Sequence, residues 1–569
     1  MGPSRPGSPP PHRVAPAPAW PVLAVSAAAL LVYAAVALAR MGFPFELEWI
    51  EGGSLSMVHR VAEGRPLYVA PSLAYVPFNY PPLYYWVGAA LVSLFGDSFA
   101  PLRALSFAGS LACGALLFVL VLGMTHRRTA AVLAAGLFFA TFRLSGAWFD
   151  LARTDSLHLA FVLAAMAVLL FDRSPRRGPL AAAALGVLGV LTKQSALVAL
   201  LPAAIWLLAV QRRRGLWFAG AFAAGLAGAV AALDATSDGW FRYYVFELAG
   251  RYSMDPLLAG RFWREDFFRP LAVCVLAGLW AWAFPPERAE RRGLAWAMIA
   301  GLVLASWTVR AYPATYDNVL MPACAAAAWL LGLGWDVVLF RAERMTAPAG
   351  ARLGRLATLV VLLQFTALLY DPFRQIPPAT DRAEGEALLE NIARTRGEVL
   401  VPCHSYLTRR AGKGEHFHEM SFMAVAKSGD DTTAVRLREQ LRLAIAETRW
   451  DWVILDTRDW LFDQIDGAYE PRYDPFRSDS AFWPVTGMRR RPEAVFVPRD
   501  TVASAGAVTP NRPRTPAPAP QTMSPHVAGT SDEAAAALPV NRRTPPRGAR
   551  NESAARTRAS SETSPSESQ

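Results

Sequence analysis

The chain has 569 residues, of which 53% are hydrophobic and 18% are charged, and its formal net charge is +11 at pH 7. This composition is too apolar for an ordinary soluble protein and is typical of a chain that crosses a membrane many times. The positive charge is almost entirely arginine in short loops between apolar stretches, so membrane topology explains it better than nucleic-acid binding. The four cysteines, Cys113, Cys274, Cys324 and Cys403, have no metal-ligand spacing, and three of them lie in apolar stretches, so no disulfide framework is implied.

The N-terminal two thirds of the chain predict an all-α polytopic membrane domain. Residues 1–18 are rich in proline and are expected to be a disordered cytoplasmic N-terminus. Residues 19–372 are expected to form about eleven transmembrane helices. The apolar stretches of near-membrane length are 19–39, 101–124, 129–147, 157–171, 178–194, 196–210, 215–233, 270–285, 293–309, 319–340 and 354–371.

A further apolar stretch, residues 81–96, decides the orientation of the chain. If it does not cross the membrane, every strongly basic short loop falls on the cytoplasmic side, as the positive-inside rule requires. If it does cross, every later basic loop moves to the outside. We therefore expect residues 81–96 to form a juxtamembrane or re-entrant helix, within an outer loop that spans residues 40–100.

The outer side also receives everything after about residue 372. Residues 373–498 predict a small extracytoplasmic α/β domain, because helical periodicity and short buried strands occur at 383–396, 399–402, 433–448 and 452–456. Residues 499–569 are rich in Pro, Ser, Thr, Ala and Arg and are expected to be a disordered tail.

The excess of arginine and alanine over lysine is typical of a GC-rich bacterial genome. We therefore expect a multi-pass protein of the bacterial inner (plasma) membrane. An endoplasmic reticulum location remains compatible with the composition.

Three carboxylates, Glu46, Glu48 and Glu51, follow the first apolar stretch directly. Carboxylates are costly at the edge of a bilayer unless they serve a site. Glu48 and Glu51 are three residues apart and would share one face of a helix, and a carboxylate with a raised pKa can act as a general base. The alternative is that these residues cap and solvate a surface helix.

An aromatic run, Tyr80-Pro81-Pro82-Leu83-Tyr84-Tyr85-Trp86, lies in the same outer loop. Paired prolines followed by aromatic residues suit a rigid turn that seats a helix at the membrane interface. Tyr80 and Tyr84 are therefore candidates for substrate binding. The alternative is an ordinary belt of interfacial aromatic residues.

Polar residues at the outer ends of later apolar stretches are candidates for binding a phosphate or a sugar. Arg153 and Asp155 lie at the outer end of one apolar stretch, and the guanidinium group of arginine is suited to binding phosphate. Lys193, one of three lysines, lies at a predicted membrane boundary, where it either snorkels or binds a lipid-linked phosphate. Arg310 and Asn318 bracket another outer loop.

Other patterns narrow the class of protein. His416 and His418 lie between glutamates, but two histidines two apart on a helix point away from each other, so we predict no metal site. No GxGxxG, P-loop or GxSxG motif is present, which argues against nucleotide-driven chemistry. A transporter or flippase would show paired repeats or charged residues at mid-membrane depth. A non-catalytic scaffold that presents residues 373–498 is a third hypothesis.

These motifs, in this order, resemble those of the GT-C membrane glycosyltransferases, in the branch with protein O-mannosyltransferases and the aminoarabinose transferase of lipid A. The matching elements are Glu48/Glu51, the run Pro81–Trp86, Arg153-Thr154-Asp155, Lys193, and Arg310 through Asn318 with Met321 and Pro322. The family often has adjacent Asp and Glu, whereas here the acids are separated, and we favour Glu48 over Glu51 as the base.

The resemblance implies an inverting sugar transfer at the outer face. The donor would be a sugar on a polyprenyl phosphate within the membrane lipids, and the acceptor a hydroxyl of a lipid, glycan or protein. The carboxylate would deprotonate that hydroxyl, while Lys193 and Arg310, or Arg153, would stabilise the departing phosphate. No nucleic acid is implied as a partner. A divalent metal occurs in some relatives, but no ligand set is evident, so no cofactor is predicted.

Overall fold

The computed structural model describes residues 20–285, 291–313, 315–429, 431–457 and 462–499. The expected disordered segments, 1–18 and 499–569, lie outside these residues except for residue 499.

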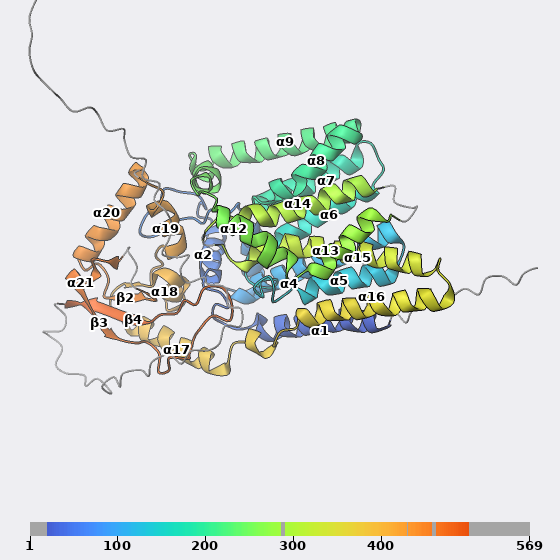
Figure 1. Ribbon diagram of the computed structural model, residues 1–569. Coiled ribbons are helices and arrows are strands. Elements are labelled where there is room, and N and C mark those ends of the chain that lie inside the picture. Colours follow the sequence, from blue (N-terminus) through green and yellow to red (C-terminus); the bar gives the residue numbers. More distant parts are fainter. Residues whose placement is uncertain (1–19, 286–290, 314, 430, 458–461, 500–569) are drawn as a thin grey trace, which may run out of the picture.

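A bundle of long helices forms one end of the molecule, and a small sheet with its own helices forms the other (Figure 1). In the bundle, α5, α13, α14 and α16 all pack against α15, which is buried along most of its length because it is apolar on every side. The bundle helices are α1 (Trp20–Met41), α4 (Phe99–Thr125), α5 (Arg128–Ala140), α6 (Asp155–Phe171), α7 (Arg177–Thr192), α8 (Ala196–Val210), α9 (Arg212–Ala235), α13 (Ala272–Ala283), α14 (Arg292–Arg310), α15 (Met321–Ala342) and α16 (Ala347–Ala367).

Five helical segments of the described chain are long and apolar enough to cross a membrane. They are α1, α4, α9, α14 and the segment Asp317–Ala342, which contains α15. A bent pair, Pro256–Phe268 with Ala272–Ala283, makes a sixth if it is counted as one span. The chain is therefore a mostly helical, multi-pass membrane protein.

Four other expected spans, α5 to α8, form apolar helices of only 13 to 17 residues. A helix needs about 20 residues to cross the hydrocarbon core. Residues 141–154, between α5 and α6, are turns and bends whose backbone is mostly buried in protein, where irregular structure is tolerated. Helices α5 to α8 are thus shorter than the length of about 20 residues that a membrane span needs.

Two helices of the outer loop lie at the end of the bundle that faces the sheet: α2 (Glu51–Ala62) and α3 (Leu83–Phe95). They pack on each other, α3 contacts α4, and α2 contacts α18 beside the sheet. The segment around residues 81–96 contains α3, an apolar helix of 13 residues, which by length belongs with α5 to α8.

Short helical segments join α9 to α13 and occur at other turns. The α-helical ones are α10 (Trp240–Arg242), α11 (Leu248–Gly250) and α12 (Pro256–Arg261). The π- and 3-10 segments are Tyr243–Glu247, Phe262–Phe268, Asp317–Leu320, Phe373–Gln375 and Pro402–His404.

The sheet has four strands in the order β1-β2-β4-β3. Strand β1 (Val399–Leu400) runs parallel to β2 (Trp452–Leu455), and β4 (Ala494–Pro498) runs antiparallel to β2 and to β3 (Tyr469–Tyr473). The surrounding helices are α17 (Ala379–Arg394), α18 (Tyr406–Arg410), α19 (Glu419–Ala426), α20 (Thr432–Ala446) and α21 (Ile465–Ala468). These elements include both strands and both helices expected between residues 383 and 456.

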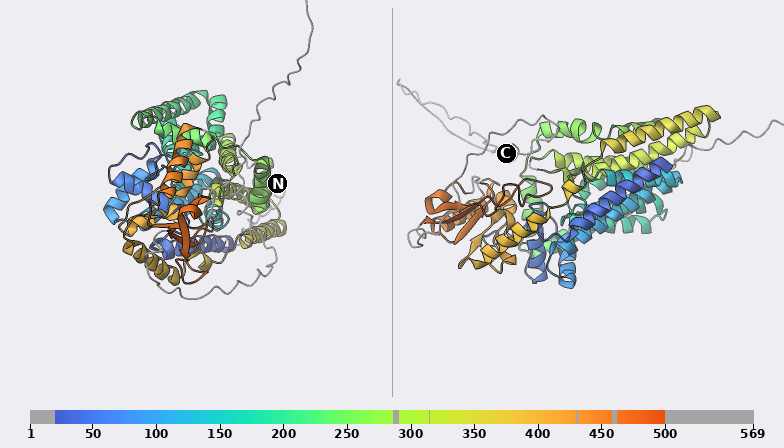
Figure 2. Two further views of the ribbon diagram at one scale, coloured as in Figure 1. Left: turned by 90° about the vertical axis from the view of Figure 1, so that its left-hand side faces the viewer. Right: turned by 90° about the horizontal axis from the view of Figure 1, so that it is seen from below.

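The sheet region and the outer loop share one hydrophobic core, separate from that of the bundle. Phe45, Trp49 and Tyr85 of the loop belong to it together with Tyr406 and Val453 of the sheet region. The two further views show the sheet region set against the end of the bundle (Figure 2). The outer loop is therefore packed against the sheet region at this end of the bundle.

Candidate active site

Glu51, the first residue of α2, is buried and fully hydrogen-bonded. Arg103 of α4 donates from Nε to Oε1 at 3.1 Å and from Nη2 to Oε2 at 2.7 Å. The backbone N–H groups of Ala152 and Leu47 donate to the same carboxylate, each at 2.7 Å. Burial raises the pKa of Glu51, but the charge and hydrogen bonds of Arg103 outweigh this and hold the pKa below its ordinary value. Such a carboxylate stays ionised. It links the start of α2 to α4, to the segment before α6 and to the outer loop.

Glu48 is buried in a different environment. Its Oε2 accepts a hydrogen bond from the backbone N–H of Ile50 at 3.2 Å and lies 3.9 Å from Nη1 of Arg153. Its Oε1 is buried and has no hydrogen-bond partner within the described structure. Burial raises the pKa of Glu48 to about 8, and the charge of Arg153 offsets this only in part. A carboxyl group poised near neutral pH suits a general base, so the geometry favours Glu48 over Glu51.

Arg153 connects Glu48 to the aromatic run of the outer loop. Its Nη2 donates to the hydroxyl of Tyr80 at 3.1 Å, and its guanidinium lies over the rings of Tyr80 and Trp148. The Tyr84 hydroxyl points elsewhere and lies 3.3 Å from both Leu102 O and Ser106 Oγ of α4. Tyr80 thus lies in the site, whereas Tyr84 packs α3 against the bundle.

The polar ends of three helices meet at Asp155, the first residue of α6. Lys193, directly after α7, donates to Asp155 Oδ1 at 2.5 Å, and Asn318, just before α15, donates to the same oxygen at 2.9 Å. These three residues line one small cavity together with His158 and Ser195. The sequence reasoning missed His158 and Ser195, since neither lies in a recognisable motif.

Arg310, at the end of α14, has other partners. It donates to Asp266 at 2.8 and 3.3 Å and pairs with Asp317 at 3.3 Å. Asp317 precedes Asn318, so Arg310 lies next to the Asp155 cluster along the chain. Among the described contacts, however, it bonds to none of that cluster's side chains.

Four buried polar atoms around Arg153 have no hydrogen-bond partner in the described part of the chain. They are Glu48 Oε1, Arg153 Nη1, Thr154 Oγ1 and Asp155 Oδ2. Buried polar groups are nearly always hydrogen-bonded, and each one left unbonded costs about 1–3 kcal/mol. A polar ligand held beside these residues would satisfy them.

The sheet region contributes one group that the sequence did not reveal. His404 is hydrogen-bonded through Nδ1 to Glu46 of the outer loop, and its Nε2 lies 3.0 Å from Asp456 Oδ2, directly after β2. Burial lowers the pKa of His404, but the charges of Asp456 and Glu46 outweigh it and raise the pKa to about 10. The imidazolium therefore pairs with Asp456 and with Glu46 and holds the sheet region to the outer loop. Burial raises the pKa of Glu46 itself to about 7 in spite of the charge of His404, so Glu46 carries its full charge in this bridge only above neutral pH.

This bridge predicts a pH-dependent stability. Because the folded pKa of His404 is raised, its contribution is complete below the unfolded pKa, about 6.5, and is lost as pH rises through about 10. We expect His404→Gln to lower the unfolding midpoint most below pH 6.5 and least near pH 10. Thermal unfolding of both proteins across this pH range measures the difference, and His126→Gln, at an exposed position, is the control. A difference that does not change with pH would contradict the charged bridge.

A loop after the sheet's third strand covers Glu48. The backbone N–H of Thr486 donates to Leu47 O at 3.3 Å, and its hydroxyl is hydrogen-bonded to Gly146 O. Gly487 has φ +76°, and a Cβ at this position would lie 2.6 Å from Glu48 Cγ. Both the backbone conformation and the lack of space require glycine here.

The histidines of the sheet region have partners other than a metal. Across the described ranges, no three His, Cys, Asp or Glu side chains are grouped so that they could hold a metal ion. His416 lies within 3.4 Å of Trp450 Nε1 and Glu398, whereas His418 bonds to Trp49 O and caps α19. In the described ranges, His416 and His418 are therefore held by these protein groups.

Comparisons with other proteins agree with the motif pattern. The model of the family described as dolichyl-phosphate-mannose-protein mannosyltransferase matches residues 79–237, which contain Tyr80, Arg153, Asp155 and Lys193. ArnT from Cupriavidus metallidurans in the apo state is 12% identical, with a TM-score of 0.52, over 84% of this chain and 97% of ArnT. A comparison with curated protein sequences gives no significant match.

A second solved structure has a similar arrangement. It is the archaeal oligosaccharyltransferase AglB from Archaeoglobus fulgidus, in complex with an inhibitory peptide and a dolichol-phosphate. It is 11% identical, with a TM-score of 0.50, over 76% of this chain and 69% of AglB.

The fold is that of the GT-C membrane glycosyltransferases. Residues 79–237 are similar to the dolichyl-phosphate-mannose-protein mannosyltransferases. The resemblance expected from the order of the motifs is confirmed.

Proposed function

We propose that this protein is an inverting glycosyltransferase that moves a sugar from a polyprenyl phosphate to an acceptor hydroxyl. The observation that carries the proposal is the group of unbonded buried atoms on Glu48, Arg153, Thr154 and Asp155. The matched family is described by a dolichyl-phosphate sugar, and the AglB structure holds a dolichol-phosphate. We therefore propose that the donor of this chain is a sugar linked through phosphate to a lipid.

The proposed reaction begins at Glu48, which takes the proton of the acceptor hydroxyl. The acceptor oxygen then attacks the anomeric carbon, and the bond from that carbon to the phosphate oxygen breaks on the opposite face. The polyprenyl phosphate leaves with the bonding electrons, and Arg153 and Lys193 stabilise its charge. Asn318 and Tyr80 are proposed to orient the donor, with Arg310 as a second candidate for the phosphate. Glu48 finally releases its proton to solvent.

We propose a topology in which the site lies outside the cytoplasm. We propose that the shorter helices α5 to α8 also cross the membrane with their flanking turns, which gives about eleven spans. Basic connectors such as Arg212-Arg213-Arg214 then lie in the cytoplasm with the N-terminus. The bundle would be residues 19–372, and an extracytoplasmic domain of residues 373–498 would cover the site in the inner membrane.

A transfer assay tests the proposed function. The purified full chain in nanodiscs is given radiolabelled polyprenyl-phosphate sugars together with lipid, glycan or peptide acceptors. We expect release of polyprenyl phosphate with transfer of label to one acceptor. If the folded protein turns over no lipid-linked sugar, the proposal is wrong, and a transporter or scaffold becomes the better hypothesis.

The raised pKa of Glu48 predicts the pH dependence of this assay. The base must be deprotonated, so the active fraction rises with pH through the folded pKa of about 8. We expect kcat to increase about tenfold per pH unit below 7 and to level off above 8. A rate that is constant from pH 5 to 9, with donor at saturation, would exclude Glu48 as the base.

A further inference from the structure

Strands β3 and β4 are joined by a long connection, residues 474–493, which forms neither helix nor strand. Connections of more than about 12–15 residues without secondary structure are uncommon in compact domains and usually serve a function. Groups within the connection hold its shape, since Arg491 donates to Ser478 O and Ala481 O at 3.0 and 2.9 Å and pairs with Asp474 at 3.4 Å. Its conformation is therefore built into the sheet region.

The tip of this connection, residues 484–488, reaches from the sheet region to the outer loop and the bundle. Val485 packs against the core of the bundle. The side chain of Thr486 is hydrogen-bonded to Gly146 O, in the turns between α5 and α6, and its backbone N–H donates to Leu47 O at 3.3 Å. The tip thus closes the junction of the three regions.

The same tip lies directly against the proposed base. The side chain of Glu48 is completely buried, and its Oε1 has no hydrogen-bond partner in the described structure. A Cβ placed on Gly487 would lie 3.2 Å from this oxygen, so the backbone of Gly487 faces the atom that is proposed to take the acceptor's proton. An acceptor hydroxyl that bonds to Oε1 would therefore lie next to the tip.

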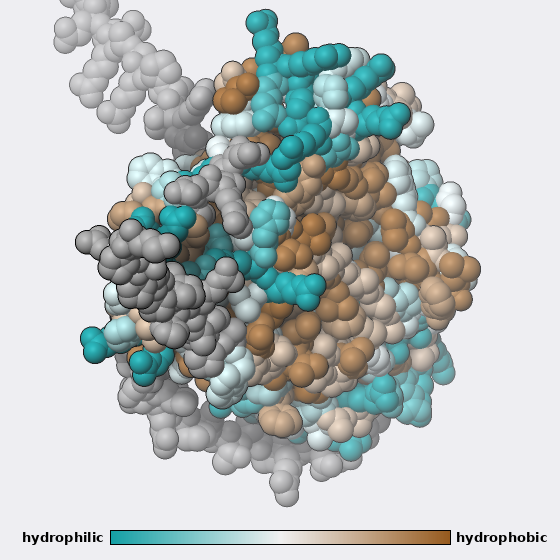
Figure 3. All heavy atoms as spheres, turned by 90° about the vertical axis from the view of Figure 1, so that its right-hand side faces the viewer, coloured by the Kyte–Doolittle hydropathy of each residue, from teal (hydrophilic) through white to brown (hydrophobic). Residues whose placement is uncertain are grey.

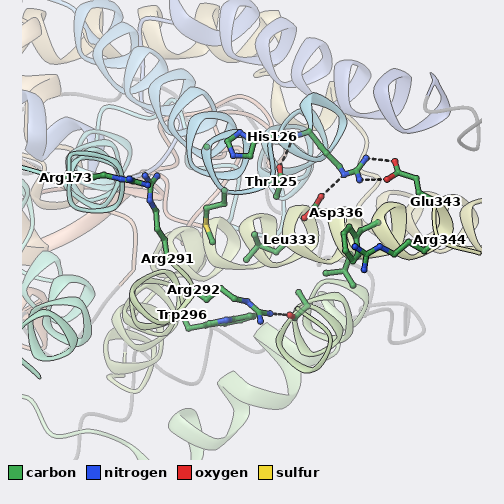
Figure 4. A pocket seen from close by; sticks show the side chains of 16 residues that line it. Thr125, His126, Arg173, Arg291, Arg292, Trp296, Leu333, Asp336, Glu343 and Arg344 are labelled. Atoms are coloured by element: carbon green, nitrogen blue, oxygen red, sulfur yellow. Dashed lines mark hydrogen bonds and ion pairs between the residues drawn. The ribbon is translucent and has the colours of Figure 1, made fainter. Parts of the chain in front are cut away.

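The opposite end of the bundle has a large cavity, but that cavity is far from Glu48. Its volume is about 610 Å³, and it is lined by the ends of α4, α13, α14 and α15 and by the loops beside them (Figure 4). Helix α14 runs from Arg292 in this cavity to Arg310 near the Asp155 cluster, about 27 Å at 1.5 Å per residue. Apolar side chains cover much of the surface seen from that end, as expected where lipid contacts the protein (Figure 3). We therefore expect a polar acceptor to approach Glu48 from the sheet side.

A base that can deprotonate an acceptor hydroxyl can also deprotonate water. Glu48 would then take a proton from water, the water oxygen would attack the anomeric carbon, and the bond from that carbon to the phosphate oxygen would break. The products would be the free sugar and the polyprenyl phosphate, so the donor would be lost without transfer. Excluding water from a site prevents side reactions of this kind.

We propose that the tip determines the choice of acceptor: it keeps water away from Glu48 Oε1 and is displaced when the acceptor binds. This inference rests on the proposed function. Each hydrogen bond of Thr486 adds little net free energy to the closed state, so the binding energy of an acceptor can offset its loss. A water molecule makes too few contacts to do so. Thr486 is then the positioning residue that holds the tip closed.

Carbodiimide labelling of Glu48 tests the closure without any sugar transfer. The full chain in nanodiscs is treated with a water-soluble carbodiimide and glycine ethyl ester, and peptide mass spectrometry follows the labelling rate. Thr486→Val keeps the shape of the side chain but removes the hydroxyl, so we expect labelling to be about threefold to tenfold faster. Thr486→Ser keeps the hydroxyl and should label like the wild type. So should the matched control Thr395→Val, whose hydroxyl bonds to Asn391 O within α17.

The ratio of products tests the choice of acceptor. With the donor and acceptor that the transfer assay identifies, free sugar and transferred sugar are measured separately. We expect Thr486→Val to raise the ratio of free to transferred sugar by about the same threefold to tenfold, and Thr486→Ser and Thr395→Val to leave it unchanged.

Thermal unfolding midpoints check that each variant is folded, and Thr486→Ala replaces Thr486→Val if the latter does not fold. The proposal is overturned if loss of the hydroxyl leaves the labelling rate of Glu48 unchanged, or if labelling becomes faster while the product ratio stays the same. A wild type that releases no polyprenyl phosphate would instead contradict the proposed function, and the labelling rates would still show whether the tip covers Glu48.

Discussion

Glu48→Gln is expected to lower kcat for sugar transfer by about 10²–10⁴-fold and to leave the protein folded. General-base catalysis contributes about this much, and the amide of glutamine keeps the size of the side chain but cannot take a proton. The measurement is release of polyprenyl phosphate at saturating donor. Since burial raises the pKa of Glu48, ionising it costs stability, so the variant should unfold at the same temperature or higher.

The matched control is Glu63→Gln at the end of α2. Glu63 belongs to the same outer loop but is partly exposed and pairs with Arg65 and Arg409. Surface pairs of this kind contribute little, so both activity and stability should stay close to those of the wild type. Full activity of Glu48→Gln would remove the proposed base, and equal losses in the two variants would indicate a general disturbance of the loop.

The sequence predicted the acidic cluster but not the different roles of its members. Glu46, Glu48 and Glu51 look alike in the chain, yet their partners are His404, Arg153 and Arg103. Each partner lies far away in sequence, so no local pattern contains it. The distinction between an ionised, fully bonded carboxylate and one with a raised pKa arises only when distant segments pack together.

Hydropathy was sufficient to place the other candidates at the same end of the bundle. Asp155, Lys193 and Asn318 all lie at predicted outer ends of spans, and the structure brings them within hydrogen-bond distance. Arg310 fits the same pattern but pairs with Asp266 instead. Which helix ends become neighbours depends on the packing around α15, and hydropathy does not encode that packing.

The contribution of the sheet region could not be predicted for a related reason. The strands that hold Asp456 in place were visible from their apolar runs. His404 has no spacing that marks it, and its role follows from meeting Glu46 across a core that joins two regions distant in sequence. Helix lengths were overestimated where apolar stretches continue into buried turns, as they do after α5.

Glu51→Gln is expected to give the largest loss of stability in the outer loop. The bidentate pair of Glu51 with Arg103 is completely buried, and breaking such a pair typically costs about 3–5 kcal/mol, because the remaining charge is left without a partner. The loss should appear as a lower thermal unfolding midpoint and as faster proteolysis of the outer loop. Activity per folded molecule should fall much less than in Glu48→Gln.

The double variant Glu51→Gln/Arg103→Met separates charge imbalance from lost packing. It removes the unpaired cation and keeps a long apolar stem against Phe99, whose ring lies 4.8 Å from the guanidinium carbon of Arg103. Replacing both members of a buried pair is often far less costly than replacing one, so we expect the midpoint to recover in part. If the single variant is as stable as the wild type but inactive, the roles are reversed, and Glu51 is the base rather than the residue that positions the loop.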